Sequence, residues 1–306
     1  MLHKHPGQWQ RGFLLALLTT TLWGVLPLAL TIVLQALDAY TLTWFRFTLS
    51  FSLLSVLLLH QQQFPSLSRI YPKNWRLLLV ATVFLGCNYF LFLQGLSLTS
   101  PGTVEVVIQL APVLFGLGAI LIFRERYILQ QWAGLAVLIM GLMVFFHDKL
   151  GTLLTTQGLY LLGVGMIFLA ALAWSGYALA QKQLLRSFSS SQIMVLIYGG
   201  CMVLFLPKVD FASFLTLTPL QGGLLLFCGL NTLIAYGSFA ESLNHWYASK
   251  ISAVLSTAPL ITLASVEVAA LVIPQYIASE QITLLGVFGA VCVVSGSMSI
   301  ALFGNR

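Results

Sequence analysis

Ten long apolar runs, separated by short polar loops, constrain this fold more than any other feature of the sequence. A helix needs roughly 20 mostly apolar residues to cross a bilayer, because each residue adds about 1.5 Å. The runs are continuous, whereas the strands of a membrane barrel alternate and are about half as long, so we expect helices. The predicted spans are residues 12–34, 40–59, 75–97, 101–123, 129–146, 158–181, 192–207, 220–242, 248–273 and 281–303.

The composition agrees with a chain whose main solvent is lipid. Only 7% of the residues are charged and 59% are hydrophobic, whereas a soluble domain carries roughly 25% charge. A soluble enzyme, a nucleic-acid-binding protein and a disordered scaffold are therefore excluded. The first run, 12–34, is longer than the apolar core of about 7–15 residues in a cleaved signal, so we expect a retained helix. The four cysteines lie in apolar runs, which favours packing over disulfides or metal binding.

With the N-terminus placed inside, the loop bases fall almost entirely on one side of the membrane. The inner side receives Lys4, Arg11, Arg69, Lys73, Arg76, Arg124, Arg126, Lys182, Arg186, Lys250 and Arg306. The outer loops receive only Lys149 and Lys208, and they hold Asp38, Asp148, Asp210 and Glu280. Cytoplasmic loops carry an excess of Lys and Arg. We therefore predict a multi-pass protein of the plasma membrane, here a bacterial inner membrane, with both termini cytoplasmic.

Matched residues recur at constant spacing in the two halves of the chain. One set is Tyr89, Gln94, Ala111 and Pro112, which corresponds to Tyr236, Glu241, Ala258 and Pro259. A second set is Glu125, Gly134 and Gly141, which corresponds to Glu280, Gly289 and Gly296, and Trp23 corresponds to Trp174. The repeats predict two five-helix domains, residues 1–148 and 156–306. Because five is odd, the second domain enters the membrane inverted, a construction typical of secondary transporters.

These features together resemble the EamA-like branch of the drug/metabolite transporter superfamily. The resemblance rests on the two five-helix halves, Trp23 and Trp174, the two Ala-Pro pairs, and a Glu nine residues before a Gly of the fifth helix. It implies an all-α integral membrane fold of ten helices and a carrier of small metabolites, often an amino-acid exporter, with a central cavity lined by both halves. It also implies that Glu125 and Glu280 are structural turn residues. An extra segment with Pro274 and Gln275 departs from the symmetry of the halves.

Three charged residues lie away from the ends of the predicted spans, in the outer third of the membrane. Arg46 is the only base away from the ends of the spans, and a central arginine costs about 2.5–3.5 kcal/mol, so it needs a partner, a wet cavity or a route to the headgroups. Glu105 and Glu267 are its natural partners. If the three residues meet, one acid pairs with Arg46 and the other is free to titrate. We therefore interpret both acids as candidates for proton coupling.

Polar and aromatic residues at mid-depth are the candidates for binding substrate, together with Arg46. They are Trp23, Asn88, Tyr89, Gln109, Trp174, Tyr177, Asn231 and Tyr236. Aromatic walls with a few amide and hydroxyl groups suit small zwitterions, while hydrogen bonding between helices is the alternative role. Pro112 and Pro259 predict helix kinks near the midplane, which would free the carbonyls of Ile108 and Leu255 or serve packing alone. Glu241 and Lys250 are expected at the inner ends, as interface residues or a gate pair.

The sequence thus predicts a secondary active transporter, most directly an exporter of amino acids or related metabolites that works by alternating access. A drug or organic-cation exporter and a lipid-linked sugar flippase are the alternatives. An intramembrane enzyme is remote, because the sequence has no HExxH zinc pair and no paired aspartates. We expect no cofactor, no metal and no nucleic-acid partner. The expected partners are a small-molecule substrate and the lipid bilayer. The glycines of helices five and ten allow close helix packing, either within the monomer or in a homodimer through these two helices.

Overall fold

The computed structural model describes residues 9–65, 74–111, 114–115, 117–118, 128–147, 158–246, 251, 254–280 and 282–303. Within these ranges the chain is helical between its turns, and no strand occurs among them. The long apolar helices are α1 (Trp9–Val33), α2 (Ala39–His60), α4 (Trp75–Leu98), α9 (Gly158–Leu184), α10 (Ser190–Phe205) and α11 (Pro219–His245). Shorter helices are α5 (Pro101–Val107), α7 (Leu129–Phe145), α13 (Ala258–Val272) and α14 (Leu284–Phe303). The prediction of an all-helical, multi-pass membrane protein is confirmed at this level.

The few acids of the predicted outer loops begin helices. Asp38 accepts hydrogen bonds from the backbone amides of Tyr40 and Thr41, at 2.7 and 3.2 Å, where α2 starts. Asp210 accepts one from the Ala212 amide at the start of the 3-10 turn Phe211–Thr216. The first amides of a helix have no partner within the helix, and the helix dipole favours negative charge there. The scarce carboxylates of this chain are thus used as caps.

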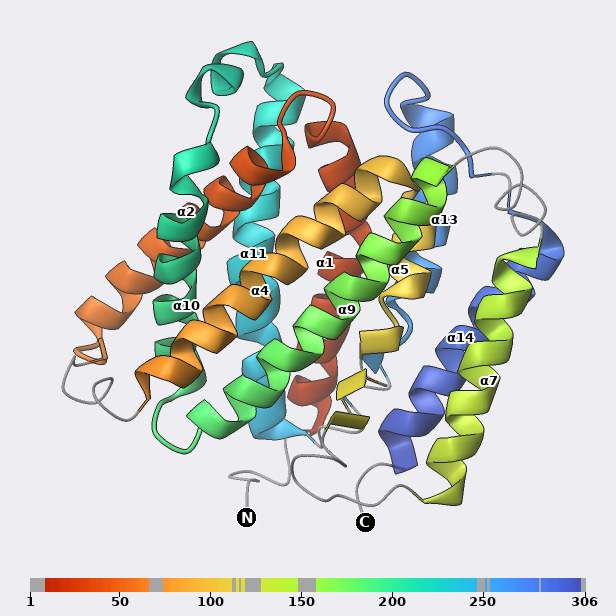
Figure 1. Cartoon of the computed structure of the whole chain (residues 1–306), viewed down its shortest axis with the longest axis horizontal. Coiled ribbons are helices and arrows are strands. Elements are labelled where there is room, and N and C mark those ends of the chain that lie inside the picture. The colour runs from red at the N-terminus through yellow and green to blue at the C-terminus, as the bar shows by residue number, and fades with distance from the viewer. Residues whose placement is uncertain are drawn as a thin grey trace.

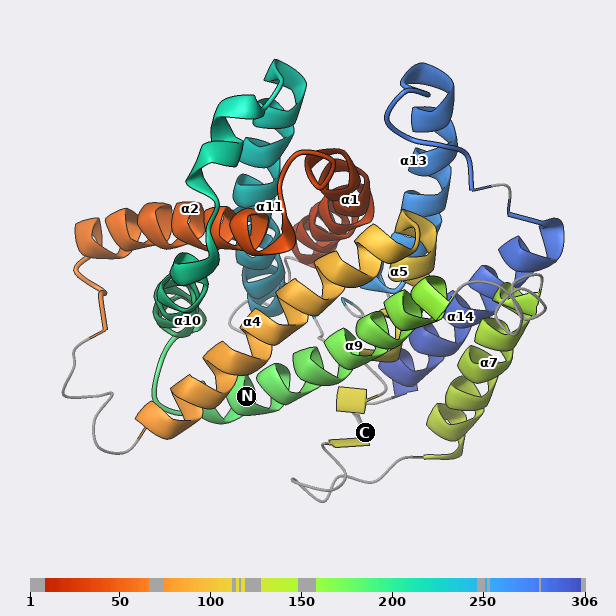
Figure 2. The ribbon, with the colours of Figure 1, turned by 45° about the horizontal axis from the view of Figure 1, so that its top comes forward.

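The helices pair across the two halves of the chain. In Figures 1 and 2, α7 and α14 lie side by side at one edge of the bundle, and α2 packs against α10 at the other. Between these edges α1 packs on α11, α4 packs on α9, and α5 packs on α13. When the halves are matched in chain order, the contact of α1 with α11 corresponds to that of α4 with α9. Such exchanged contacts are what a two-fold relation between the halves produces, and they support the predicted repeat.

Glycines let α7 and α14 touch backbone to backbone. A Cβ atom on Gly141 would lie 2.6 Å from the amide nitrogen of Val293, and one on Gly296 would lie 2.5 Å from the carbonyl oxygen of Gly134. No side chain fits at such distances, so this face of each helix requires glycine. The glycines are therefore used within the chain. A homodimer through α7 and α14 would have to use their other faces, and it stays a prediction.

The fourth and ninth predicted spans are interrupted, which corrects the expectation of two continuous helices. The helix α5 ends at Val107, and the Ile108 carbonyl accepts a hydrogen bond from the Ala111 amide at 2.8 Å, in a tight turn. The expected free carbonyl at Ile108 is thus satisfied, and Pro112 lies outside the described residues. In the other half a turn at residues 256–257 precedes α13. Pro259 occupies the first turn of α13, where its missing amide costs no helical hydrogen bond.

Candidate functional site

Arg46 of α2 is buried between α2, α4 and α11, with 4% of its surface exposed. Its Nε atom donates a hydrogen bond to the Thr232 hydroxyl of α11 at 3.1 Å, and its Cζ atom lies 4.5 Å from the centre of the Tyr89 ring on α4. The side chain therefore does not reach the headgroups. No carboxylate among the described residues forms an ion pair with it, so the expected pairing with Glu105 or Glu267 is wrong.

Four tyrosines that share one hydrophobic core near this arginine form what we call the tyrosine cluster: Tyr89, Tyr177, Tyr198 and Tyr236. They lie within electrostatic reach of one another. The hydroxyl of Tyr89 lies close to the side chains of Thr232 and Tyr236. The Tyr198 hydroxyl donates to the Thr232 carbonyl at 3.4 Å, and that of Tyr177 donates to the sulfur of Met194 at 3.1 Å. Tyr89 and Tyr198 thus both contact Thr232, the residue that also binds the guanidinium of Arg46.

Trp23 extends this cluster from α1. Its ring lies 5.4 Å from that of Tyr236, edge to face, and 6.1 Å from that of Phe239. Trp174 of α9 contacts Phe115 at 6.4 Å and packs on the same hydrophobic core as Tyr236. The structure therefore brings the predicted aromatic residues to one region and joins Trp23, Tyr236 and Tyr89 to Arg46.

Tyr198 and Thr232 were missed by the sequence analysis. A signal for Tyr198 existed, because Phe47 and Tyr198 are separated by the same number of residues as Trp23 and Trp174. The rings of Phe47 and Tyr198 are 5.8 Å apart. The matched residues Tyr89 and Tyr236 also contact each other. No comparable signal pointed to Thr232. The cluster thus lies where corresponding helices of the two halves meet.

The two asparagines join helices, which favours the alternative role given to them. The amide nitrogen of Asn88 donates to the Ala170 carbonyl at 2.9 Å and so connects α4 to α9. That of Asn231 donates to the Leu22 carbonyl at 2.7 Å and connects α11 to α1. The carbonyl oxygen of Asn231 is buried without a partner among the described residues.

Gln109 belongs to a separate polar contact between the two interrupted stretches. Its carbonyl oxygen accepts a hydrogen bond from the Ser297 hydroxyl at 3.2 Å, and Ser297 also contacts the Ser256 hydroxyl at 3.1 Å. Gln109 and Ser256 are separated by the same spacing as Tyr89 and Tyr236. A buried polar contact thus joins equivalent positions of the two interrupted stretches to α14.

The two acids predicted for proton coupling have different surroundings. Glu105 lies on α5 with 7% of its surface exposed, and its carboxylate has no hydrogen-bond or ion-pair partner among the described residues. Glu267 on α13 is exposed. It accepts hydrogen bonds from the Ser279 hydroxyl at 2.8 Å and the Glu280 amide at 3.3 Å. Glu267 therefore anchors a loop, while Glu105 is an unpaired buried acid.

Glu280 connects that loop to the start of α5. Its carboxylate accepts hydrogen bonds from the Ser100 hydroxyl at 2.8 Å and from the Gly102 amide at 2.7 Å. A Cβ atom on Gly102 would lie 2.6 Å from the same carboxylate, so glycine is required for the approach. Glu280 is thus a structural capping residue, as the family resemblance implied. Glu125, its counterpart, lies outside the described residues.

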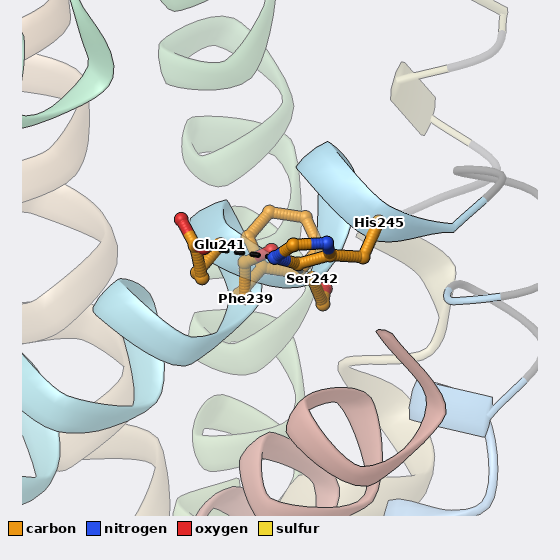
Figure 3. A network of polar contacts seen from close by, with 4 residues as sticks. All are labelled: Phe239, Glu241, Ser242 and His245. Atoms are coloured by element: carbon orange, nitrogen blue, oxygen red, sulfur yellow. Dashed lines mark hydrogen bonds and ion pairs between the residues drawn. The ribbon is translucent and has the colours of Figure 1, made fainter. Parts of the chain in front are cut away.

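At the opposite end of the bundle, Glu241 and His245 form a pair on the last turn of α11. The Nε2 atom of His245 and a carboxylate oxygen of Glu241 are 2.9 Å apart, and the Ser242 hydroxyl donates to the Phe239 carbonyl one turn earlier (Figure 3). Lys250, the predicted partner of Glu241, lies outside the described residues. The structure thus places Glu241 at the end of α11, beyond Tyr236, the residue of the tyrosine cluster on that helix.

Apolar helices long enough to span a membrane, two interrupted stretches that pack together, and a buried arginine among aromatic rings are typical of a helical membrane transporter. A sequence model of the EamA-like transporter family matches residues 10–147 and, a second time, residues 161–302. The chain belongs to this family.

Relatives carry names of the same kind. The chain is 37% identical over 295 residues to an "Uncharacterized transporter" of Haemophilus influenzae, covering 95% of this chain and 94% of the relative. It is 36% identical over 296 residues to the "Uncharacterized inner membrane transporter YhbE" of Escherichia coli K12, covering 96% and 92%. A crystal structure with 17% sequence identity shares the fold, with a TM-score of 0.65 over 97% of this chain and 99% of the other.

Proposed function

We propose that this transporter exports amino acids or related small metabolites by alternating access around Arg46 and the tyrosine cluster. Secondary transporters often bind substrate between two repeats, beside helices that are interrupted at corresponding positions. The breaks before Ala111 and before Ala258 lie at matched positions, and α5 packs on α13. The proposed site lies between helices of both halves, so a movement of one half against the other would open it to either side.

The proposal includes two inverted five-helix repeats, residues 1–148 and 156–306. Three observations support them: the family model matches the chain twice, the helix contacts are exchanged between halves, and matched residues such as Tyr89 and Tyr236 meet. With the predicted positive-inside topology, both termini are cytoplasmic and the membrane is the bacterial inner membrane, as in the name of the Escherichia coli relative.

The observation that carries the proposal is the uncompensated charge of Arg46. A buried charge is costly unless it is paired, and only the Nε atom of this guanidinium is hydrogen-bonded to a described residue. Its two terminal nitrogens can bind a carboxylate in the bidentate geometry that arginine favours. The faces of Tyr236 and Trp23 are suited to an ammonium group or an apolar side chain. An amino acid supplies the missing carboxylate, an ammonium group and a side chain.

A reconstituted exchange screen tests the proposal. Purified protein in liposomes would be loaded with unlabelled amino acids, nucleobases, sugars or organic cations in turn, and entry of the matching labelled compound would be measured. We expect exchange of at least one amino acid. In Arg46→Gln that exchange falls at least about tenfold, since a hydrogen-bonded charge pair is worth roughly 1.5–3 kcal/mol. Arg46→Lys keeps the charge without the bidentate geometry, so its exchange should lie between that of the unmodified protein and that of Arg46→Gln.

Arg76→Gln is the matched control. Like Arg46, Arg76 has its guanidinium over an aromatic ring, that of Trp75, but it is exposed at the start of α4. Its exchange should equal that of the unmodified protein. Gel filtration and thermal unfolding of each variant exclude loss of the fold as the cause. Failure of every amino acid, together with exchange of an organic cation, would refute the proposal.

Export of organic cations is the second candidate, and a single observation favours it. The buried carboxylate of Glu105 has no partner among the described residues, so it offers a negative charge for a cationic substrate. We rank it second because the arginine lies within the aromatic cluster, whereas no contact joins Glu105 to those rings. The same screen separates the two candidates.

A further inference from the structure

We propose that Glu105 is the proton-binding group that couples transport to the proton gradient; this inference rests on the proposed function. Glu105 holds its proton in the arrangement seen here, in which its side chain is buried. It releases the proton to water when the halves separate around it, and it takes one back from water on the other side. Only an O–H bond breaks and re-forms, so the step needs no further reactant.

Glu105 differs from the other acids that the structure describes. Each of the others accepts at least one hydrogen bond: Asp38, Asp210, Glu241, Glu267 and Glu280. Only Glu105 has no partner within the described ranges. Burial of an unpaired carboxylate is costly, and a bound proton removes that cost. An acid thus lies at a position where the arrangement seen here gains nothing from its charge, which points to another arrangement that does.

The helices packed against α5 do not offset this charge. They are α1, α4, α9 and α13. The Tyr160 hydroxyl of α9 is bound to Thr103, 2.8 Å away, and Glu267 of α13 is exposed and bound to its loop. The remaining titratable groups are Arg11 of α1, Arg76, Cys87 and Tyr89 of α4, and Tyr177 and Lys182 of α9. Among the described residues, none of these groups forms a hydrogen bond or an ion pair with Glu105.

The position of Glu105 makes its environment depend on the transport cycle. Two of the helices around α5 belong to the first half of the chain, α1 and α4, and two belong to the second, α9 and α13. Glu105 also lies one turn before the break at residues 108–109. A displacement of one half relative to the other must therefore change what surrounds this carboxyl group. Water reaching it would stabilise the carboxylate, and exclusion of water would restore the acid.

Two measurements on Glu105→Gln test the proposal, with Glu267→Gln as the matched control because Glu267 is the exposed acid of α13. The first needs no substrate: infrared spectra taken across a pH series in detergent report the carbonyl stretch of a protonated carboxylic acid. We expect the unmodified protein and Glu267→Gln to show this band at neutral pH, and Glu105→Gln to lack it. Persistence of the band in Glu105→Gln would overturn the proposal.

The second measurement is the ratio of labelled amino-acid flux with and without a pH gradient in liposomes, using the amino acid that exchanges best in the screen. The ratio should exceed one in the unmodified protein and in Glu267→Gln, and fall to one in Glu105→Gln. Glu105→Asp, which keeps a carboxyl group, should keep a ratio above one, so the proposal remains testable if the glutamine variant is unstable. A pH-gradient response that survives in Glu105→Gln overturns the proposal. The proposal is also overturned if the only effect of Glu105→Gln is that the protein no longer binds an organic cation. If no amino acid is exchanged, the proposed function fails while the infrared result still decides the role of Glu105.

Discussion

The guanidinium carbon of Arg46 lies 4.5 Å from the centre of the Tyr89 ring, on a neighbouring helix. The ring face is the negative part of an aromatic side chain, so it stabilises the charge and fixes the plane of the guanidinium. Because the Nε atom is bound to Thr232, the terminal nitrogens are left to a substrate. The ring thus serves to orient the group that we propose binds the carboxylate.

Replacement of Tyr89 by leucine is therefore expected to weaken binding more than replacement by phenylalanine. Loss of the ring removes an interaction worth about 1–2 kcal/mol, which corresponds to a rise of roughly 5- to 30-fold in the KM for amino-acid exchange. Tyr89→Phe keeps the ring and loses only the hydroxyl contacts with Thr232 and Tyr236, so its KM should rise less. Equal KM values for the two variants would mean that the ring does not orient Arg46.

Asn88 should contribute to stability and not to substrate affinity. Its side chain connects α4 to α9 through the Ala170 carbonyl, and such bonds between membrane helices are worth about 0.6 kcal/mol on average and about 1.7 at most. We expect Asn88→Ala to lower the thermal unfolding temperature in detergent while the KM for exchange stays at its original value. A large change in KM with unchanged unfolding would return Asn88 to the substrate site.

The features of the sequence that decide the fold are the apolar runs, since lipid requires each spanning segment to satisfy its own backbone hydrogen bonds. All predicted spans except the fourth and the ninth coincide with one helix each. The two exceptions share a cause. Hydropathy does not change where a helix is interrupted inside the membrane, so 101–123 and 248–273 read as continuous. The Ala-Pro pairs lie close to both interruptions, but a proline in a sequence is compatible with a kinked helix as well as with a broken one.

The candidate site was predictable in most of its members and not in its contacts. Arg46, Tyr89, Tyr177 and Tyr236 stood out because polar residues in apolar spans are expensive, whereas Tyr198 was missed. A single sequence does not reveal which of them meet, because depth in the membrane says nothing about the direction in which a helix faces. Arg46 and Glu105 share a depth, yet Arg46 meets Tyr89 and Thr232 while Glu105 meets no charge. Thr232 had no signal, since a threonine is common in membrane helices.

Removal of the Glu280 carboxylate should loosen the start of α5. The carboxylate holds the Ser100 hydroxyl and the Gly102 amide, and loss of a helix cap costs about 0.5–2 kcal/mol. In Glu280→Gln we expect amide hydrogen exchange over residues 101–107 to rise roughly 2- to 30-fold. Asp210→Asn is the control, because Asp210 caps a different element, Phe211–Thr216. A rise over 101–107 of the same size in Asp210→Asn would show that the effect is not local to the cap.

Two glycine-to-alanine changes should have opposite effects on stability. At Gly141 of α7 the added methyl group would lie 2.6 Å from the amide nitrogen of Val293 and 2.8 Å from the carbonyl oxygen of Gly289, so α14 must move away. Overpacking of this kind costs about 1–3 kcal/mol, and the unfolding temperature should fall. At Gly165 of α9 nothing lies within 4 Å, and alanine in a helix is favoured over glycine by about 0.5–1 kcal/mol, so the temperature should stay equal or rise. Thermal unfolding of the two variants in the same detergent checks both expectations. If Gly141→Ala were as stable as Gly165→Ala, the close contact between α7 and α14 would not exist in solution, and the paired glycines would instead be free to serve a contact between two copies of the chain.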